Sequence, residues 1–159
     1  MKTNASVFSV SIIVTVLLIS ASGATGKKMV EVDDAMKSIS GIWVNTEYSG
    51  TDIFHPQKFV LTSDGRVEFW MNTTLEYPTA TGKYNVTKSW TDLKGNLYST
   101  IELEYYDGDK SQDLWKLDKS GNTLEVNYRM AGSGYPERID PNPRAKPPQY
   151  EYYFILYRQ

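Results

Sequence analysis

The sequence contains few residues of the kinds that enzymes use for catalysis. His55 is the only histidine, and there is no cysteine. A thiol nucleophile, a disulfide scaffold and a metal site built from several histidines or thiolates all lack the residues they need. No serine or acidic residue stands in a pattern that pairs a nucleophile with a base. We therefore expect no enzyme activity, no cofactor and no metal.

Two pairs of carboxylates have spacings that could do chemistry. Asp107 and Asp109 flank a glycine, an arrangement that could approach a calcium ion but is far more often a hairpin turn. Glu102 and Glu104 are two residues apart, which places both on one face of a strand. A solvated outer face explains this second pair better than catalytic carboxylates do.

The length and charge balance limit the classes of partner. The 159 residues include 17 Lys and Arg and 19 Asp and Glu, for a formal charge of −2. This length has room for one ordinary domain. The near-neutral balance offers no basic surface of the kind that nucleic acid requires.

Residues 1–24 have the pattern of a secretory signal peptide. Lys2 supplies a positive start, residues 7–19 are largely apolar, and residues 20–24 are small. A helix over the apolar run would span about 20 Å, short of the roughly 30 Å hydrocarbon core. We expect cleavage near Ala24 and export to the periplasm or outside the cell. The alternative is an uncleaved N-terminal anchor.

The rest of the chain is predicted to be all-β. After an N-terminal segment, residues 25–40, short β-rich runs alternate with turn signals, and no later window has a helical apolar stripe. One peripheral helical turn is expected over residues 33–39, capped by Asp33 or Asp34. The domain at 41–159 is expected to contain eight strands, at residues 41–48, 58–63, 66–72, 82–91, 97–106, 112–117, 123–130 and 150–157.

Alternation of apolar and polar residues gives several of these strands one dry face. The apolar sets are Phe59 and Leu61; Tyr84, Val86 and Trp90; Leu97, Ile101 and Leu103; and Leu124, Val126 and Tyr128. An eight-stranded antiparallel meander with one dry face can close into an up-and-down barrel, which removes exposed edges. The interior of such a barrel holds either packed side chains or one small ligand, and the pattern leaves both open.

The connections indicate which end of the barrel would carry a site. Alternate connections of an up-and-down barrel share one end. The connections at residues 64–65, 94–96 and 119–122 are short and suit compact hairpins. The opposite end has the long connections, at residues 49–57, 73–81 and 131–149.

Binding residues concentrate on loops that a rigid scaffold holds, so the long-loop end is the predicted ligand site. The residues expected to contact the ligand are Phe54, His55, Tyr77 and Tyr135 at the rim, and Tyr84 and Tyr128 deeper inside. For His55, a solvated loop position is the more common alternative.

The last predicted strand has two apolar faces. Tyr150, Tyr152 and Phe154 alternate with a second set, namely Tyr153, Ile155 and Tyr157. One set fills the barrel, and the other needs a cover. The cover could be the N-terminal segment, the long loop or a second subunit, so this strand is a possible interface for a protein partner or a homodimer.

Three short motifs mark the beginning, the middle and the end of the predicted barrel. Gly41-Ile42-Trp43 follows a short helical segment and opens the first strand, Gly82-Lys83-Tyr84 opens a middle strand, and Arg158 closes the last. This arrangement resembles the bacterial lipocalin-like proteins of the calycin superfamily. The resemblance covers about residues 36–159. The start at Gly41 also matches the G-x-W-x-N opening of avidins, but the other tryptophans do not match.

The resemblance implies a barrel closed at one end by Trp43, with Arg158 laid across its indole ring and Gly41 allowing the helix to pass close by. These three residues would be structural. The sequence departs from classical lipocalins in having no cysteine, no T-D-Y motif and no helix after the last strand. Transport of a retinoid-like ligand is therefore not implied.

Two functions follow from these patterns. The first is an exported lipocalin-like barrel that binds a small apolar or amphipathic molecule at its long-loop end. The alternative is a non-catalytic structural or interaction protein of the cell envelope whose barrel interior is filled by side chains.

Overall fold

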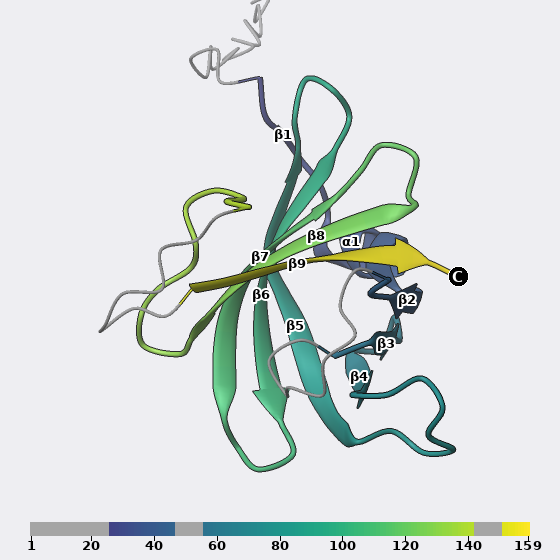
Figure 1. Cartoon of the computed structure of the whole chain (residues 1–159). Helices are drawn as coiled ribbons and strands as arrows, with labels where there is room; N and C mark the ends of the chain where they lie inside the picture. Colours follow the sequence, from purple (N-terminus) through teal and green to yellow (C-terminus); the bar gives the residue numbers. More distant parts are fainter. Residues whose placement is uncertain (1–25, 47–55, 142–150) are drawn as a thin grey trace, which may run out of the picture.

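The computed structural model describes residues 26–46, 56–141 and 151–159. Eight antiparallel strands form a closed barrel, preceded by a two-residue strand and one helix (Figure 1). The elements are β1 (Lys28–Met29), α1 (Val32–Ile39), β2 (Gly41–Val44), β3 (Lys58–Leu61), β4 (Arg66–Trp70), β5 (Ala80–Thr91), β6 (Leu97–Tyr105), β7 (Lys110–Leu117), β8 (Thr123–Met130) and β9 (Glu151–Arg158).

The predicted all-β, eight-stranded antiparallel barrel is confirmed. Each strand from β2 to β9 pairs with its neighbours along the chain, and β2 pairs with β9 to close the ring. The bounds differ by a few residues: β2 ends at Val44, β5 begins at Ala80 and β7 begins at Lys110.

One end of the barrel is closed by three short turns and by α1. The β3–β4 turn illustrates the turns: Gly65 has a φ of +86° and donates its N–H to the Thr62 carbonyl oxygen at 3.0 Å. The Met36 side chain of α1 lies close to this glycine. The helix therefore covers the end with short turns, and the opposite end carries the long connections.

The helix α1 is more central than the sequence suggests. It begins at Val32 after Glu31, and neither Asp33 nor Asp34 caps it; both lie in the first turn, where their charge favours the helix dipole. Ala35 and Ile39 are fully buried in the barrel core. The expectation of a peripheral helix is wrong because these two residues, four apart, form an apolar face that the barrel end covers.

Trp43 fills the closed end, as the resemblance implied. Its side chain is fully buried, and its indole N–H donates to the Ile39 carbonyl oxygen at 2.8 Å. The Arg158 guanidinium lies over the indole ring, 4.4 Å from the centroid. The same guanidinium donates to the backbone carbonyl oxygens of Ser38, Ser40 and Gly121 at 2.6–2.9 Å. Arg158 thus joins the helix, the last strand and a closed-end turn.

Gly41 permits this close approach. Its φ of +141° is unfavourable for any residue with a side chain, and an added Cβ would lie 3.0 Å from Nη1 of Arg158. The glycine lets the chain turn from α1 into β2 directly beneath the guanidinium.

A β-bulge in β5 overturns one predicted face. The pairing of β5 with β6 shifts register between Val86 and Lys88. Beyond the shift, Ser89 points inward and is buried, while Trp90 lies half-buried on the outer wall and stacks on Tyr98 at 5.7 Å. Trp90 therefore does not share the dry face of Tyr84, because one extra residue reverses the alternation.

We expect the contact between Trp43 and Arg158 to dominate stability. Trp43→Ala should lower the free energy of unfolding by about 3–5 kcal/mol. Arg158→Ala should lower it by about 2–3 kcal/mol, because three carbonyl oxygens lose a charged donor. The double variant should lose about 1 kcal/mol less than the sum, because the two side chains share one contact.

Denaturant unfolding of the four proteins measures this coupling. Arg66→Ala is the matched control: its ion pair with Asp64 is exposed, so it should cost under about 1 kcal/mol. Strictly additive losses would show that the guanidinium does not stabilise the tryptophan.

Candidate functional site

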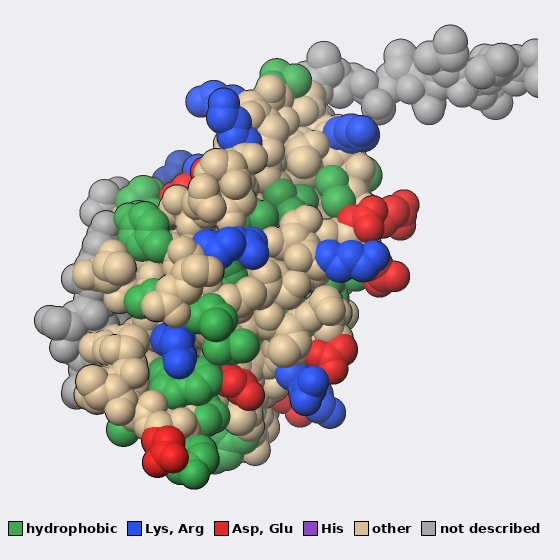
Figure 2. Space-filling model, turned by 90° about the vertical axis from the view of Figure 1, so that its right-hand side faces the viewer, with side chains coloured by type: hydrophobic (Ala, Val, Ile, Leu, Met, Phe, Trp, Pro, Cys, Tyr) green, Lys and Arg blue, Asp and Glu red, His purple; other side chains and the backbone are tan. Residues whose placement is uncertain are grey.

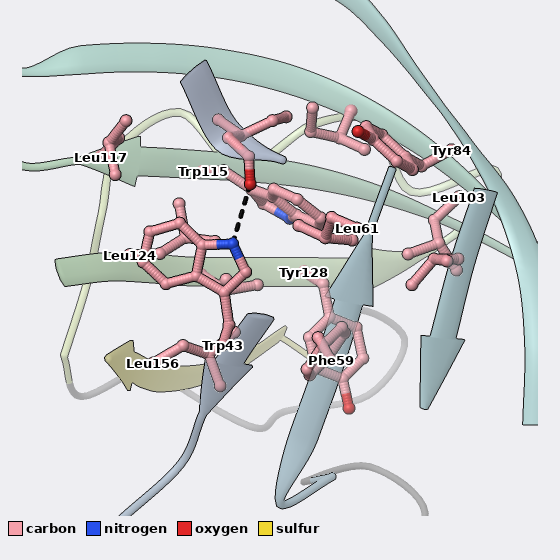
Figure 3. Close-up of a cluster of buried hydrophobic side chains, with 14 of the residues drawn as sticks. Trp43, Phe59, Leu61, Tyr84, Leu103, Trp115, Leu117, Leu124, Tyr128 and Leu156 are labelled. Carbon is pink, nitrogen blue, oxygen red and sulfur yellow. Dashed lines mark hydrogen bonds between the residues drawn. The ribbon is translucent and has the colours of Figure 1, made fainter. Parts of the chain in front are cut away.

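The barrel interior is filled by side chains, which answers the question that the alternation left open. Aromatic rings contact one another inside the barrel: Phe59 on β3 contacts Phe69 on the adjacent strand β4 at 4.9 Å and Phe154 on β9 at 5.6 Å. Figure 3 shows the buried cluster, with the Trp43 hydrogen bond dashed. Within the described residues, the cavity among these rings measures only about 20 Å³, room for one water molecule.

The mouth of the barrel holds a larger pocket, of about 160 Å³. Its lining comes from the ends of β4, β6 and β8, the first residue of β5 and the adjoining loops: Phe69, Met71, Thr79, Ala80, Tyr105, Tyr106, Asp107, Asp109, Tyr128 and Met130. Phe69, Tyr105 and Tyr128 also line the interior cavity. These three rings therefore form the floor of the mouth pocket and the roof of the interior.

Exposed hydrophobic side chains surround this mouth. Leu75 and Tyr77 on the β4–β5 loop, Tyr106 on the β6–β7 turn, and Met130 at the end of β8 are all exposed. In Figure 2, hydrophobic side chains gather at the lower end of the molecule, which carries this loop and turn in Figure 1, with both acidic and basic side chains among them. The mouth is thus more apolar than an ordinary loop region.

Asp113 lies beneath the floor of the mouth pocket. It is on β7, is only 3% exposed and lines the interior cavity. One carboxyl oxygen, Oδ2, accepts the indole N–H of Trp115 at 2.9 Å. The other oxygen, Oδ1, makes no hydrogen bond within the described residues, nor does the buried Ser111 hydroxyl. An unpaired buried carboxyl oxygen is costly, so this position is unusual for a purely structural core.

Burial changes the proton affinity of this interior group. It raises the pKa of the Asp113 carboxyl to about 7, against the opposing effect of the polar side chains of Ser111 and Trp115. Burial, and secondly the Asp113 charge, also raise the pKa of the nearby Tyr105 hydroxyl. Both groups therefore favour their neutral forms.

The predicted ligand contacts are distributed over several environments. Tyr128 lines both the mouth pocket and the interior cavity. Tyr77 is 72% exposed on the rim loop and does not line the pocket. Tyr84 is a core residue that stacks on Trp115 and donates its hydroxyl to the Thr62 carbonyl oxygen at 2.6 Å. Phe54 and His55 lie outside the described residues.

Tyr135 lies on the outer wall and not at the rim. Its hydroxyl donates to Oε1 of Glu102 at 3.0 Å, on the solvent face of β6. The segment 131–141 follows the outside of the barrel because the outward-facing Asn127 of β8 bonds to it: the Asn127 amide pairs with the backbone of Asp140 in both directions, at 2.8 and 3.1 Å. This correction removes Tyr135 and the described part of its loop from the mouth.

The two acidic pairs also have clear positions. The backbone N–H of Asp109 donates to Oδ1 of Asp107 at 3.1 Å, which makes the Asp-Gly-Asp sequence a hairpin turn. Glu102 and Glu104 are exposed on the outer face of β6, where Glu104 pairs with Lys110 at 2.9 Å. A larger hollow of about 530 Å³ lies on this outer wall, but its lysines and glutamates neutralise one another.

The sequence contained a signal for Asp113. On β7, Ser111, Asp113, Trp115 and Leu117 alternate with Gln112, Leu114 and Lys116. Once Trp115 and Leu117 are assigned to the interior, the period of two places Asp113 there as well. An acidic residue in the middle of an inward-facing set could have been identified from this pattern alone.

Comparisons with protein-family models, curated proteins and solved structures each gave no match. Within the described residues, no helix has the length and apolar character needed to cross a membrane. The candidate site is therefore defined by its own geometry.

We expect Asp113 to make stability depend on pH. The carboxyl titrates near pH 7 when folded and near its ordinary value of 3.8 when unfolded. Between these values the folded protein retains a proton that the unfolded chain releases, so stability falls as pH rises, by on the order of 4 kcal/mol in total. Asp113→Asn removes this titration and should be the more stable protein at about pH 8.

Urea unfolding from about pH 4 to pH 8 tests this prediction through the difference between parent and variant. Asp107→Asn, at an exposed carboxylate, is the control. Its free energy of unfolding should change with pH as that of the parent does. If the free energy of unfolding changes with pH equally in the parent and in Asp113→Asn, the assignment of the raised pKa to Asp113 is contradicted.

Proposed function

We propose that this protein is a non-catalytic binding protein that holds a small amphipathic molecule at the mouth of its barrel. The observation that carries this proposal is the pocket of about 160 Å³, floored by Phe69, Tyr105 and Tyr128 and surrounded by exposed hydrophobic side chains. Exposed apolar clusters bordered by polar residues are typical of binding sites.

The size of the pocket limits the ligand. A cavity of about 150 Å³ accommodates a benzene ring. The mouth pocket of about 160 Å³ therefore suits one ring or a short alkyl chain, with the remainder of the molecule in solvent. The packed interior leaves no room for a long ligand along the barrel axis, so the site is a shallow one at the rim.

Export and a lipocalin-like origin belong to the same proposal. The predicted signal peptide at residues 1–24 would deliver the barrel to the periplasm or outside the cell. The Gly41, Trp43 and Arg158 arrangement at the closed end supports a distant relation to lipocalin-like proteins. Neither point alters the chemistry of the mouth.

We expect 2-phenylethanol to bind at the mouth. In an NMR titration, it should shift the backbone amides of residues 79–80 and 105–106 more than those of the closed end. Replacing Tyr106 and Met130 together, by Ala and Ser, should weaken binding by about fivefold or more, because both line the pocket.

Leu93→Ser is the matched control for this experiment. Leu93 is also an exposed hydrophobic residue, but it lies in the β5–β6 turn at the closed end, so its replacement should leave binding unchanged. Shifts spread evenly over the surface, or an equal effect of the control, would count against a site at the mouth.

The filled interior favours a second candidate function, a structural or interaction protein of the cell envelope. The outer face of β9 carries Tyr153, Ile155 and Tyr157, each half-buried, which could pack against another subunit. Light scattering distinguishes the two functions. A binding protein should be monomeric. A dimer of the parent protein that the substitution Ile155→Asp converts to a monomer would favour the interaction function.

A further inference from the structure

We infer that the mouth of the barrel selects a small organic cation, an amine or quaternary ammonium group attached to one ring or a short chain. This inference rests on the proposed binding function and adds the charge of the ligand. It follows from the acidic residues in the mouth, the aromatic surface beside them and the carboxyl group below the floor.

The charged groups in the pocket lining are all acidic. Asp107 and Asp109 line the pocket, and none of its ten lining residues is Lys, Arg or His. The nearest lysine along the chain, Lys110, is directed to Glu104 on the outer wall, at 2.9 Å. Within the described residues, no ion pair involves Asp107 or Asp109. Their charge is therefore available to a ligand.

The same pocket presents aromatic rings, which attract cations through the electron-rich ring face. Tyr105, Tyr106 and Tyr128 line it together with Phe69. Carboxylates beside several aromatic rings are the combination that recognises ammonium groups, because the rings accept the alkyl part and the charge together. A neutral apolar molecule would use the rings alone.

Asp113 provides a second, independent observation. It lies on β7, whereas Asp107 and Asp109 lie in the turn before this strand. It is 3% exposed and lines the cavity whose roof is the pocket floor. Its Oδ1 atom has no hydrogen-bond partner within the described residues. A cation in the mouth would favour the charged form of this buried carboxyl group, whereas an anion would oppose it. In the pocket itself, an anion would face the two carboxyl groups of Asp107 and Asp109 and no lysine or arginine.

Three molecules with the same phenyl ring test the inference: 2-phenylethylamine, 2-phenylethanol and phenylacetate. At about pH 7.5 they are cationic, neutral and anionic. Affinities from NMR titration should follow that order, with the amine about tenfold tighter than the alcohol and phenylacetate the weakest. The alcohol measures the apolar contacts, so the ratio isolates the charge.

The double variant Asp107→Asn, Asp109→Asn should bind the amine at least about fivefold more weakly, while its affinity for the alcohol stays unchanged. The control is Glu102→Gln, Glu104→Gln, which makes the same change in net charge on the outer wall. It should leave both affinities unchanged.

Equal affinities for the amine and the alcohol, or an unchanged preference in the Asp107 and Asp109 variant, would overturn cation selection while leaving the binding function intact. If none of the three molecules shifts the mouth residues, the binding function itself fails, and this inference fails with it.

Discussion

The barrel closes through one short contact between its first and last strands. All other pairs among the eight barrel strands join neighbours along the chain, which a meander brings together at little cost in loop entropy. The pairing of β2 with β9 spans almost the whole domain and consists of two residue pairs, Trp43 with Arg158 and Val44 with Tyr157. The Arg158 side chain strengthens it by binding three carbonyl oxygens from two other segments. One guanidinium thus reinforces the closure of the barrel.

The closed end and the mouth have different roles because the core between them is solid. Aromatic rings from β3, β4, β8 and β9 contact one another in the interior. The cavity that remains measures about 20 Å³, which is too small for an organic ligand. We therefore place the proposed binding site at the rim, where the last inward-facing residues of β4, β6 and β8 meet solvent. The barrel acts as a rigid support that holds these residues in a fixed arrangement.

Sequence reasoning predicted the fold well, because strand alternation and turn glycines are local signals. The dry faces of β3, β6 and β8 are all buried as expected, and the link from Trp43 to Arg158 was implied by the family resemblance. The bulge before Lys88 was missed because one extra residue leaves no mark on composition, yet it moves Trp90 to the outside.

The candidate site was harder to predict because it depends on contacts between distant segments. Loop length alone suggested that Tyr135 would lie at the mouth. The buried Asn127 amide instead makes two hydrogen bonds with the backbone of Asp140, which hold the described part of that loop against the outer wall. Tyr128 points inward, as strand alternation predicted, and its contact with a ligand stays a prediction. Asp113 was recoverable from its alternation with Trp115, but only if a charged residue was accepted inside the barrel.

The position of β1 determines how the molecule would be presented to its surroundings. Lys28 and Met29 pair with Thr91 and Trp90 at the closed end, and Val30 bonds to Ser89 just below. The chain therefore reaches the barrel at the end opposite the mouth (Figure 1). A tether, a tag or a solid support joined to the chain directly before β1 would hold the protein by its closed end and leave the mouth facing outward.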